Sequence, residues 1–169
     1  MQKVLILKND RVGDYYTSIS SINLILNKHK DKDVKIFLSK TNYKFNFIFK
    51  NLDTKIFNYN LNIIEKIRIF FYLFSNNISD IYILTPKNFY FYLPFLFRNI
   101  KFFGLCINGP NNYKRPSLFL RKLLFKYVVN DREAIYKRDH TTKLQSDLTN
   151  GETSNINNDI QIKLKNSDF

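Results

Sequence analysis

The chain has 169 residues, of which 44% are hydrophobic and 17% aromatic, with a single Cys and no Trp. These proportions supply enough apolar side chains for the core of one domain, and they exclude a disulfide-stapled mini-protein and a chain that is disordered throughout. The 27 Lys and Arg residues outnumber the 14 Asp and Glu residues, which gives a net charge of +13. Such a charge favours binding to phosphate-rich partners, but it does not distinguish nucleic acid from anionic lipid or lipopolysaccharide.

Short apolar runs alternate with longer stretches of helical periodicity over the first two thirds of the chain. The predicted strands are residues 4–7, 34–38, 54–57, 81–84 and 100–104, and the predicted helices are residues 15–30, 42–51, 61–77 and 87–97. Strands and helices in this order indicate an α/β domain with a mainly parallel sheet, flanked by helices and joined by right-handed crossovers.

The predicted helix at 61–77 has a strongly two-sided pattern. Its Ile and Phe residues at 63, 64, 67, 70, 71 and 74 recur at helical intervals, while Glu65, Lys66 and Arg68 lie on the other face. An amphipathic helix packs its apolar stripe on the core. We therefore expect the Ile and Phe stripe to be the buried face.

The character of the sequence changes after Gly104. Loop residues at 108–112 precede an amphipathic basic helix predicted at 117–130, and a polar stretch with near-helical apolar spacing runs to Leu148, with Gly151 placed as a helix cap. We expect one domain at 1–151, followed by a linker or frayed tail at 152–169.

Several features bear on location and on metal binding. No apolar run approaches the length that spans a bilayer, and the apolar residues before Lys8 are too few for a signal peptide, so a cytoplasmic location is expected. Cys106 cannot form an internal disulfide, which fits a reducing compartment. His29, His140 and Cys106 are too widely separated for a zinc site, so no metal is expected.

The turn from Lys8 to Asp14 carries the most chemical information. It follows the first strand, and ligands of parallel α/β sheets bind beyond the carboxyl ends of the strands. Gly13 can adopt a backbone conformation that other residues avoid, and Asp14 stands at or just inside the helix N-terminus. Asp14 is then either a helix cap or a functional carboxylate. Neither a dinucleotide-binding glycine pattern nor a P-loop is present.

The run from Val4 to Asp14, ending in Asp10-Arg11-Val12-Gly13-Asp14 and followed by a helix rich in Thr, Ser and Ile, resembles the opening of glycosyltransferase family 9, the ADP-heptose:lipopolysaccharide heptosyltransferases. Residues 80–84 and 101–104 are similar to two later strands of that family. His140, Leu144, Leu148 and Gly151 are similar to its later His and Leu-rich helix. The resemblance covers roughly residues 1–151.

The resemblance implies a Rossmann-like, mainly parallel sheet flanked by helices, equivalent to the N-terminal, acceptor-side half of a GT-B glycosyltransferase. It implies an inverting, metal-independent transfer in which Asp14 is the general base. The residues it assigns to acceptor binding are Lys8, Asp10, Arg11, Gly13, Thr17 and Lys87. No cofactor is expected besides a nucleotide-sugar donor such as ADP-heptose. The donor-binding half is missing, so we expect a fragment, split gene product or remnant that needs a donor-domain partner chain.

The resemblance also bears on partners. It implies a lipopolysaccharide core or other glycan as acceptor, and peripheral contact with the inner face of an anionic membrane; DNA is not expected. Residues 81–130 contain eight Lys or Arg and no acid. This segment fits a surface that binds phosphorylated glycan and anionic membrane, but it fits a basic face exposed to solvent equally well. The aromatic run at 89–97 is read as a buried helix in preference to a membrane element. The alternative function is a noncatalytic basic module that binds RNA or anionic membrane.

Overall fold

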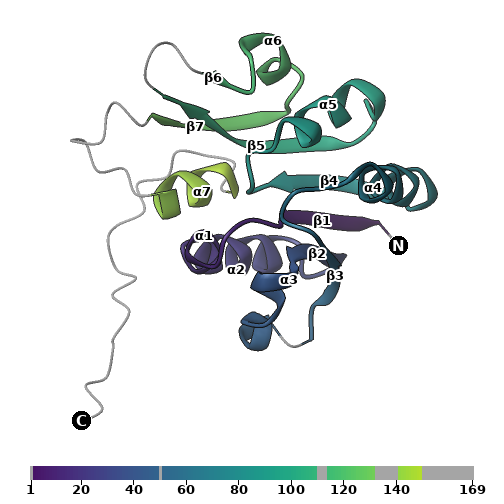
Figure 1. Ribbon diagram of the computed structural model, residues 1–169, viewed down its shortest axis with the longest axis vertical. Helices are drawn as coiled ribbons and strands as arrows, with labels where there is room; N and C mark the ends of the chain where they lie inside the picture. Colours follow the sequence, from purple (N-terminus) through teal and green to yellow (C-terminus); the bar gives the residue numbers. More distant parts are fainter. Residues whose placement is uncertain (1, 50, 110–113, 132–140, 150–169) are drawn as a thin grey trace.

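The computed structural model describes residues 2–49, 51–109, 114–131 and 141–149, which form a seven-stranded sheet with helices on both faces (Figure 1). The strands are β1 (Lys3–Lys8), β2 (Asp33–Ser39), β3 (Asp53–Phe57), β4 (Ile78–Ile83), β5 (Lys101–Asn108), β6 (Lys114–Arg115) and β7 (Lys126–Asp131). Six of them are parallel in the order β3-β2-β1-β4-β5-β7, and β6 runs antiparallel to the end of β5. This is the strand order of a doubly wound, Rossmann-like sheet, so the predicted α/β class is confirmed.

The helices lie in two layers. They are α1 (Val12–Tyr16), α2 (Ile19–Lys28), α3 (Lys40–Tyr43), the 3-10 helix η1 (Asn46–Phe49), α4 (Ile63–Ser75), α5 (Asn88–Leu96), α6 (Leu118–Arg121) and α7 (Thr141–Thr149). Figure 1 shows α1, α2 and α7 on one side of the sheet and α4, α5 and α6 on the other. Successive strand residues alternate between the two layers, so that Ile6 packs in one core cluster with Ile22 of α2, and Leu7 packs in the other with Ile69 of α4.

The helix predicted at 15–30 is interrupted. The hydroxyls of Thr17 and Ser18 donate to the carbonyl oxygen of Asp14 at 2.9 and 2.8 Å, and the Ser18 N–H bonds Tyr15 instead. Such side-chain bonds compete with the regular helical ladder. The chain therefore forms the short α1 and then α2. The helix predicted at 42–51 is likewise split into α3 and η1.

The basic helix predicted at 117–130 is wrong in its second half. Only α6 is helical there, and the following residues form β7, which pairs in parallel with β5 from Phe103 onward. The Phe125 N–H begins this alignment with a bond to the carbonyl oxygen of Phe102. Tyr127, Val128 and Val129 are residues that favour strands, and pairing with an otherwise open sheet edge outweighs their helical spacing.

The orientation predicted for the helix at 61–77 is also wrong. Glu65 is buried together with Ile69, Tyr72 and Leu73, whereas Ile63 and Phe74 are 72% and 76% exposed. The cause lies at the helix start. The Glu65 carboxylate accepts bonds from the N–H groups of Asn58 and Asn62, and Asn62 caps the helix in return. This capping box fixes which side of α4 faces the sheet.

Helix α7 confirms the predicted helical spacing near Leu148, which is fully buried in the α2 layer. Lys28 donates to the carbonyl oxygen of Thr149, and Lys126 donates to that of Asp147. These bonds satisfy backbone carbonyl groups that have no partner within the last turn of the helix. His140, Gly151 and the tail predicted at 152–169 lie outside the described residues. None of the helices in the described part of the chain is long and apolar enough to cross a bilayer.

Candidate functional site

The turn between β1 and α1 lies at the centre of the sheet. β1 pairs with β2 on one side and with β4 on the other, and Leu7 is level with Phe37 and Ile83. The chain leaves β1 toward α1 on one face and leaves β4 toward α5 on the opposite face. In open α/β sheets a ligand crevice forms where neighbouring strands send their connections to opposite faces. The predicted turn therefore occupies the position at which this fold binds ligands.

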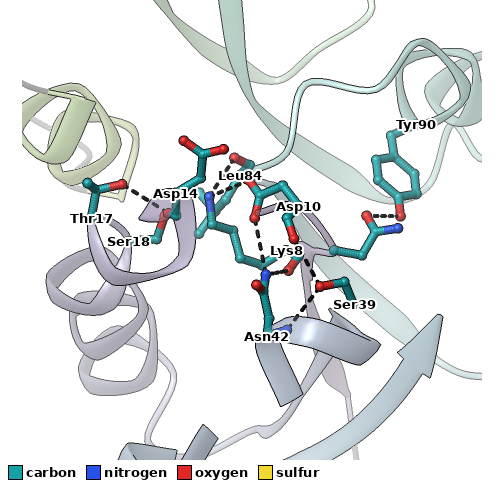
Figure 2. A network of polar contacts seen from close by, with 10 residues as sticks. Lys8, Asp10, Asp14, Thr17, Ser18, Ser39, Asn42, Leu84 and Tyr90 are labelled. Atoms are coloured by element: carbon teal, nitrogen blue, oxygen red, sulfur yellow. Dashed lines mark hydrogen bonds and ion pairs between the residues drawn. The ribbon is translucent and has the colours of Figure 1, made fainter. Parts of the chain in front are cut away.

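A buried ion pair lies beneath the turn. Lys8 is only 1% exposed, and its Nζ donates to Oδ2 of Asp10 at 2.7 Å and more weakly to the carbonyl oxygen of Leu84 at 3.4 Å (Figure 2). Burial lowers the pKa of Lys8, opposed by the charges of Asp10 and Asp14. Lys8 thus joins the end of β1 to the end of β4 from below, instead of presenting its ammonium at the surface.

The other oxygen of Asp10 is held by the neighbouring strand connection. The amide of Asn42 donates to Oδ1 of Asp10 at 3.3 Å and to the carbonyl oxygen of Lys8 at 3.1 Å. The Ser39 hydroxyl donates to the carbonyl oxygen of Asp10 at 2.9 Å and accepts a bond from the Asn42 N–H. The end of β2 therefore fixes both the backbone and the side chain of the turn (Figure 2).

Asn9 extends this network in the other direction. Its amide nitrogen donates to the carbonyl oxygen of Asn58 at 3.1 Å, and its oxygen accepts the Tyr90 hydroxyl at 2.7 Å. Burial is the main cause of a raised pKa for Tyr90, so this hydroxyl remains a proton donor at neutral pH. The turn is thereby bonded to residues that follow β2, β3 and β4.

Asp14 differs from these buried groups because it is exposed. The N-cap of α1 is Arg11, which makes no side-chain cap bond, and Asp14 is the third residue of the helix. A role as helix cap is therefore excluded for Asp14. Among the described residues, no group donates a hydrogen bond to its carboxylate. Figure 2 shows this carboxylate on the same side of the turn as the Lys8 ammonium, whose electrostatics it affects.

Three further predicted residues surround Asp14. Arg11 and Thr17 are exposed on either side of it in the chain, and Gly13 lies between them. The expectation of an unusual backbone at Gly13 is wrong, because no described glycine has a positive φ. A side chain at Gly13 would meet no atom within 4 Å, so glycine leaves open space next to the carboxylate.

Lys87 lies on the neighbouring connection, at the N-cap of α5. Its Nζ donates to the carbonyl oxygen of Tyr59 and lies 4.3 Å from the centroid of the Tyr59 ring. Burial lowers the pKa of Lys87, and the charges of Asp10 and Glu65 oppose this effect. Lys87 is therefore close to the buried ion pair and is held by Tyr59, which follows β3. Within the part of the chain that the structure describes, the side chains of Arg11 and Asp14 have no comparable hydrogen bond.

Two buried polar atoms at this edge were not predicted from the sequence. The hydroxyl of Thr85, two residues after β4, and Oδ1 of Asn42 are buried and have no hydrogen-bond partner among the described residues. Ser39, Asn42 and Thr85 could have been found by asking which polar residues follow each predicted strand, because the carboxyl ends of parallel strands meet at one edge. Two hollows, of about 580 and 310 Å³, lie elsewhere on the domain and do not include this turn.

The fold and the turn together define a Rossmann-like domain that displays one exposed carboxylate at the centre of its ligand-binding edge. Comparison with protein-family models, curated proteins and solved structures finds no match to this chain. Within the described residues, no three His, Cys, Asp or Glu side chains are grouped to hold a metal ion. The groups that the described residues present at or beside this edge include the carboxylate of Asp14, the guanidinium of Arg11 and the hydroxyl of Thr17.

Proposed function

We propose that this chain is the acceptor-side domain of an inverting glycosyltransferase of the heptosyltransferase type, in which Asp14 is the general base. The observation that carries the proposal is the exposed Asp14 carboxylate, at the switch point of the sheet, on a turn that is hydrogen-bonded to residues at the ends of β2, β3 and β4. The resemblance of residues 4–14 to the opening of glycosyltransferase family 9 supports the sugar-transfer assignment.

The reaction needs few groups from this half of the enzyme. An acceptor hydroxyl forms a bond to the anomeric carbon of the donor sugar, the bond from that carbon to the nucleoside diphosphate breaks, and the hydroxyl proton passes to the carboxylate of Asp14. A base positioned in this way contributes about 10²–10⁴-fold to the rate. Arg11, exposed beside Asp14, would hold a phosphate or carboxylate of an acidic glycan.

The buried groups act indirectly in this proposal. Lys8 and Asp10 were assigned to acceptor binding by resemblance, but only 1% of Lys8 and 7% of Asp10 are exposed. Their role here is to position the backbone that carries Arg11, Gly13 and Asp14. Gly13 leaves space for the acceptor, and Tyr16, which is 44% exposed on the same helix, offers an aromatic surface beside it.

The test uses the full chain, a phosphorylated lipopolysaccharide core oligosaccharide, ADP-heptose and a donor-binding domain added in trans. We expect calorimetry to detect oligosaccharide binding that Arg11→Ala weakens, and we expect Asp14→Asn to lower the transfer rate by about 10²–10⁴-fold. Asp31→Asn is the matched control, since Asp31 is an exposed acid between α2 and β2 at the opposite edge of the sheet. Wild-type transfer by Asp14→Asn, or no oligosaccharide binding by the wild type, would refute the proposal.

The alternative of a noncatalytic RNA-binding module rests on the net charge of +13. It predicts retention of single-stranded RNA that weakens steeply as salt is raised. RNA binding at low salt, together with unchanged transfer in Asp14→Asn, would favour this alternative over sugar transfer.

A further inference from the structure

The outward side of α4 is mostly apolar. Its exposed side chains include Ile63, Ile64, Ile67, Phe70, Phe71 and Phe74. The inward side of the same helix is also mostly apolar, with Ile69, Tyr72 and Leu73 buried against the sheet. A helix that is apolar all round is normally covered on all sides. In this domain one half of α4 has no protein cover among the described residues.

Helix α2, in the opposite layer, provides a comparison within the same fold. It buries Ile22 and Ile25 toward the sheet, and its exposed residues are Asn23, Asn27 and Lys28. A helix of this domain can therefore be stable with an ordinary polar outer face. The apolar outer face of α4 is a specific property of that side of the molecule, and apolar patches of this kind mark interaction surfaces.

The apolar surface continues from α4 onto the end of α5. The rings of Phe70 and Phe97 lie 5.3 Å apart between centroids, and Phe95 and Leu96 are 54% and 59% exposed. Figure 1 shows α4 and α5 on the same side of the sheet. We refer to the exposed apolar residues of α4, with Phe95 and Leu96, as the α4–α5 face.

The exposed charges on α4 and just after α5 are positive. Arg68 is exposed on α4, and Arg98 is exposed after α5, with its guanidinium 5.9 Å from the centroid of the Phe95 ring. Among the described residues from 63 to 130, the two acids are Glu65 and Asp80, and both are buried and bonded. On α4 and at the end of α5, apolar side chains and exposed cations therefore occur together. Asp53, an exposed acid on β3 near Tyr72, is paired with Lys35.

A hollow of about 580 Å³ opens at the rim of this face, between β3 and α4. It is lined by the cations Lys55 and Arg68 and by the apolar side chains of Ile56 and Phe71. Tyr72 also lines it, and the Tyr72 hydroxyl is buried without a hydrogen-bond partner among the described residues. Cations and apolar walls suit the phosphate and upper acyl chain of a lipid.

We propose that the α4–α5 face, with the hollow at its rim, binds the surface of an anionic phospholipid bilayer. Such a surface offers an apolar region and negative charge together, which is the complement of this face. A second copy of the chain is a poorer complement, because in a symmetric dimer of this face the exposed cations of each copy would meet no exposed acid on α4 or α5 of the other. The proposal does not depend on sugar transfer, since this face is separate from the turn that carries Asp14.

The test measures sedimentation of the full chain with lipid vesicles, either of phosphatidylcholine alone or of phosphatidylcholine mixed equally with phosphatidylglycerol. We expect the wild type to bind the anionic vesicles more strongly, and high salt to weaken that binding. Phe71→Ser combined with Phe74→Ser removes two exposed rings from the face and should lower the partition coefficient by roughly tenfold or more. Arg68→Glu should lower it for anionic vesicles only.

The matched control is Tyr43→Ser combined with Phe47→Ser, which removes two exposed rings, 49% and 59% exposed, from α3 and η1. This control should bind vesicles like the wild type, and circular dichroism should show that every variant is folded. Equal binding by the wild type and the Phe71/Phe74 variant would overturn the proposal, as would a wild type that leaves anionic vesicles unbound. A dimer that the same variant disperses, without vesicle binding, would assign the face to a second copy instead.

Discussion

The buried pair of Lys8 and Asp10 allows a quantitative test of how the ligand-binding edge is built. In Lys8→Met the apolar stem is retained and the ammonium is lost. The Asp10 carboxylate, whose side chain is only 9% exposed, then keeps the weak amide contact of Asn42 at 3.3 Å and loses its 2.7 Å partner. Breaking a buried pair in this way costs about 3–5 kcal/mol.

Urea unfolding followed by circular dichroism measures this cost. We expect a lower midpoint with an unchanged slope, and a melting temperature lower by roughly 6–20 °C for a chain of this size. Adding Asp10→Asn removes the uncompensated charge, so the double variant should recover at least about 2 kcal/mol of the loss. Lys30→Met, at an exposed lysine, should change stability by less than about 0.5 kcal/mol. A Lys8→Met variant within about 1 kcal/mol of the wild type would refute the reasoning.

Three further predictions concern single groups. Burial alone would raise the pKa of Glu65, but the hydrogen bonds from backbone N–H groups outweigh it and hold the pKa below its ordinary value of 4.5. The stability that Glu65 adds is therefore present above pH 4.5 and is lost as the pH falls through the lowered pKa. Glu65→Gln should cost about 1 kcal/mol at pH 7, and the difference from the wild type should vanish in unfolding curves measured in acid. Burial lowers the pKa of His29 below 6.5, so stability should decline as the pH drops below that value, and His29→Gln should flatten this part of a stability profile measured in urea. In Gly104→Ala the new Cβ would lie 2.7 Å from a methyl carbon of Leu124 and should cost about 1–3 kcal/mol, whereas Gly13→Ala, in open space on a helix, should be neutral or slightly stabilising; equal melting temperatures for the two variants would contradict this.

The position of the candidate site could be predicted because it depends on local patterns. Residues 4–7 form a continuous apolar run, and a run of that kind with polar neighbours on both sides is typical of a buried parallel strand. The polar turn after such a strand must lie at the carboxyl edge of the sheet. Arg11, Gly13 and Asp14 therefore lie at the edge that the sequence predicts. The bond between Lys8 and Asp10 could not be predicted in this way, because it depends on how deeply the neighbouring strand ends bury the two side chains.

The errors concern choices that only tertiary packing decides. The charged residues of α4 made the side opposite the Ile and Phe stripe look like the outer face. That side also carries Ile69, Tyr72 and Leu73, and the bonds of Glu65 to the preceding turn place it against the sheet. Residues 126–131 have acceptable helical spacing, but a sheet edge at β5 was open to them. In each case the local sequence pattern was compatible with the predicted structure, and a contact between residues far apart in the sequence decided for another one.

The bonding of Asn9 has a consequence for how a ligand would meet this domain. One amide side chain joins the turn to residues that follow two different strands, so the turn cannot swing without breaking contacts to both of them. A ligand arriving there encounters a surface that is already in place, and little ordering entropy is lost on association.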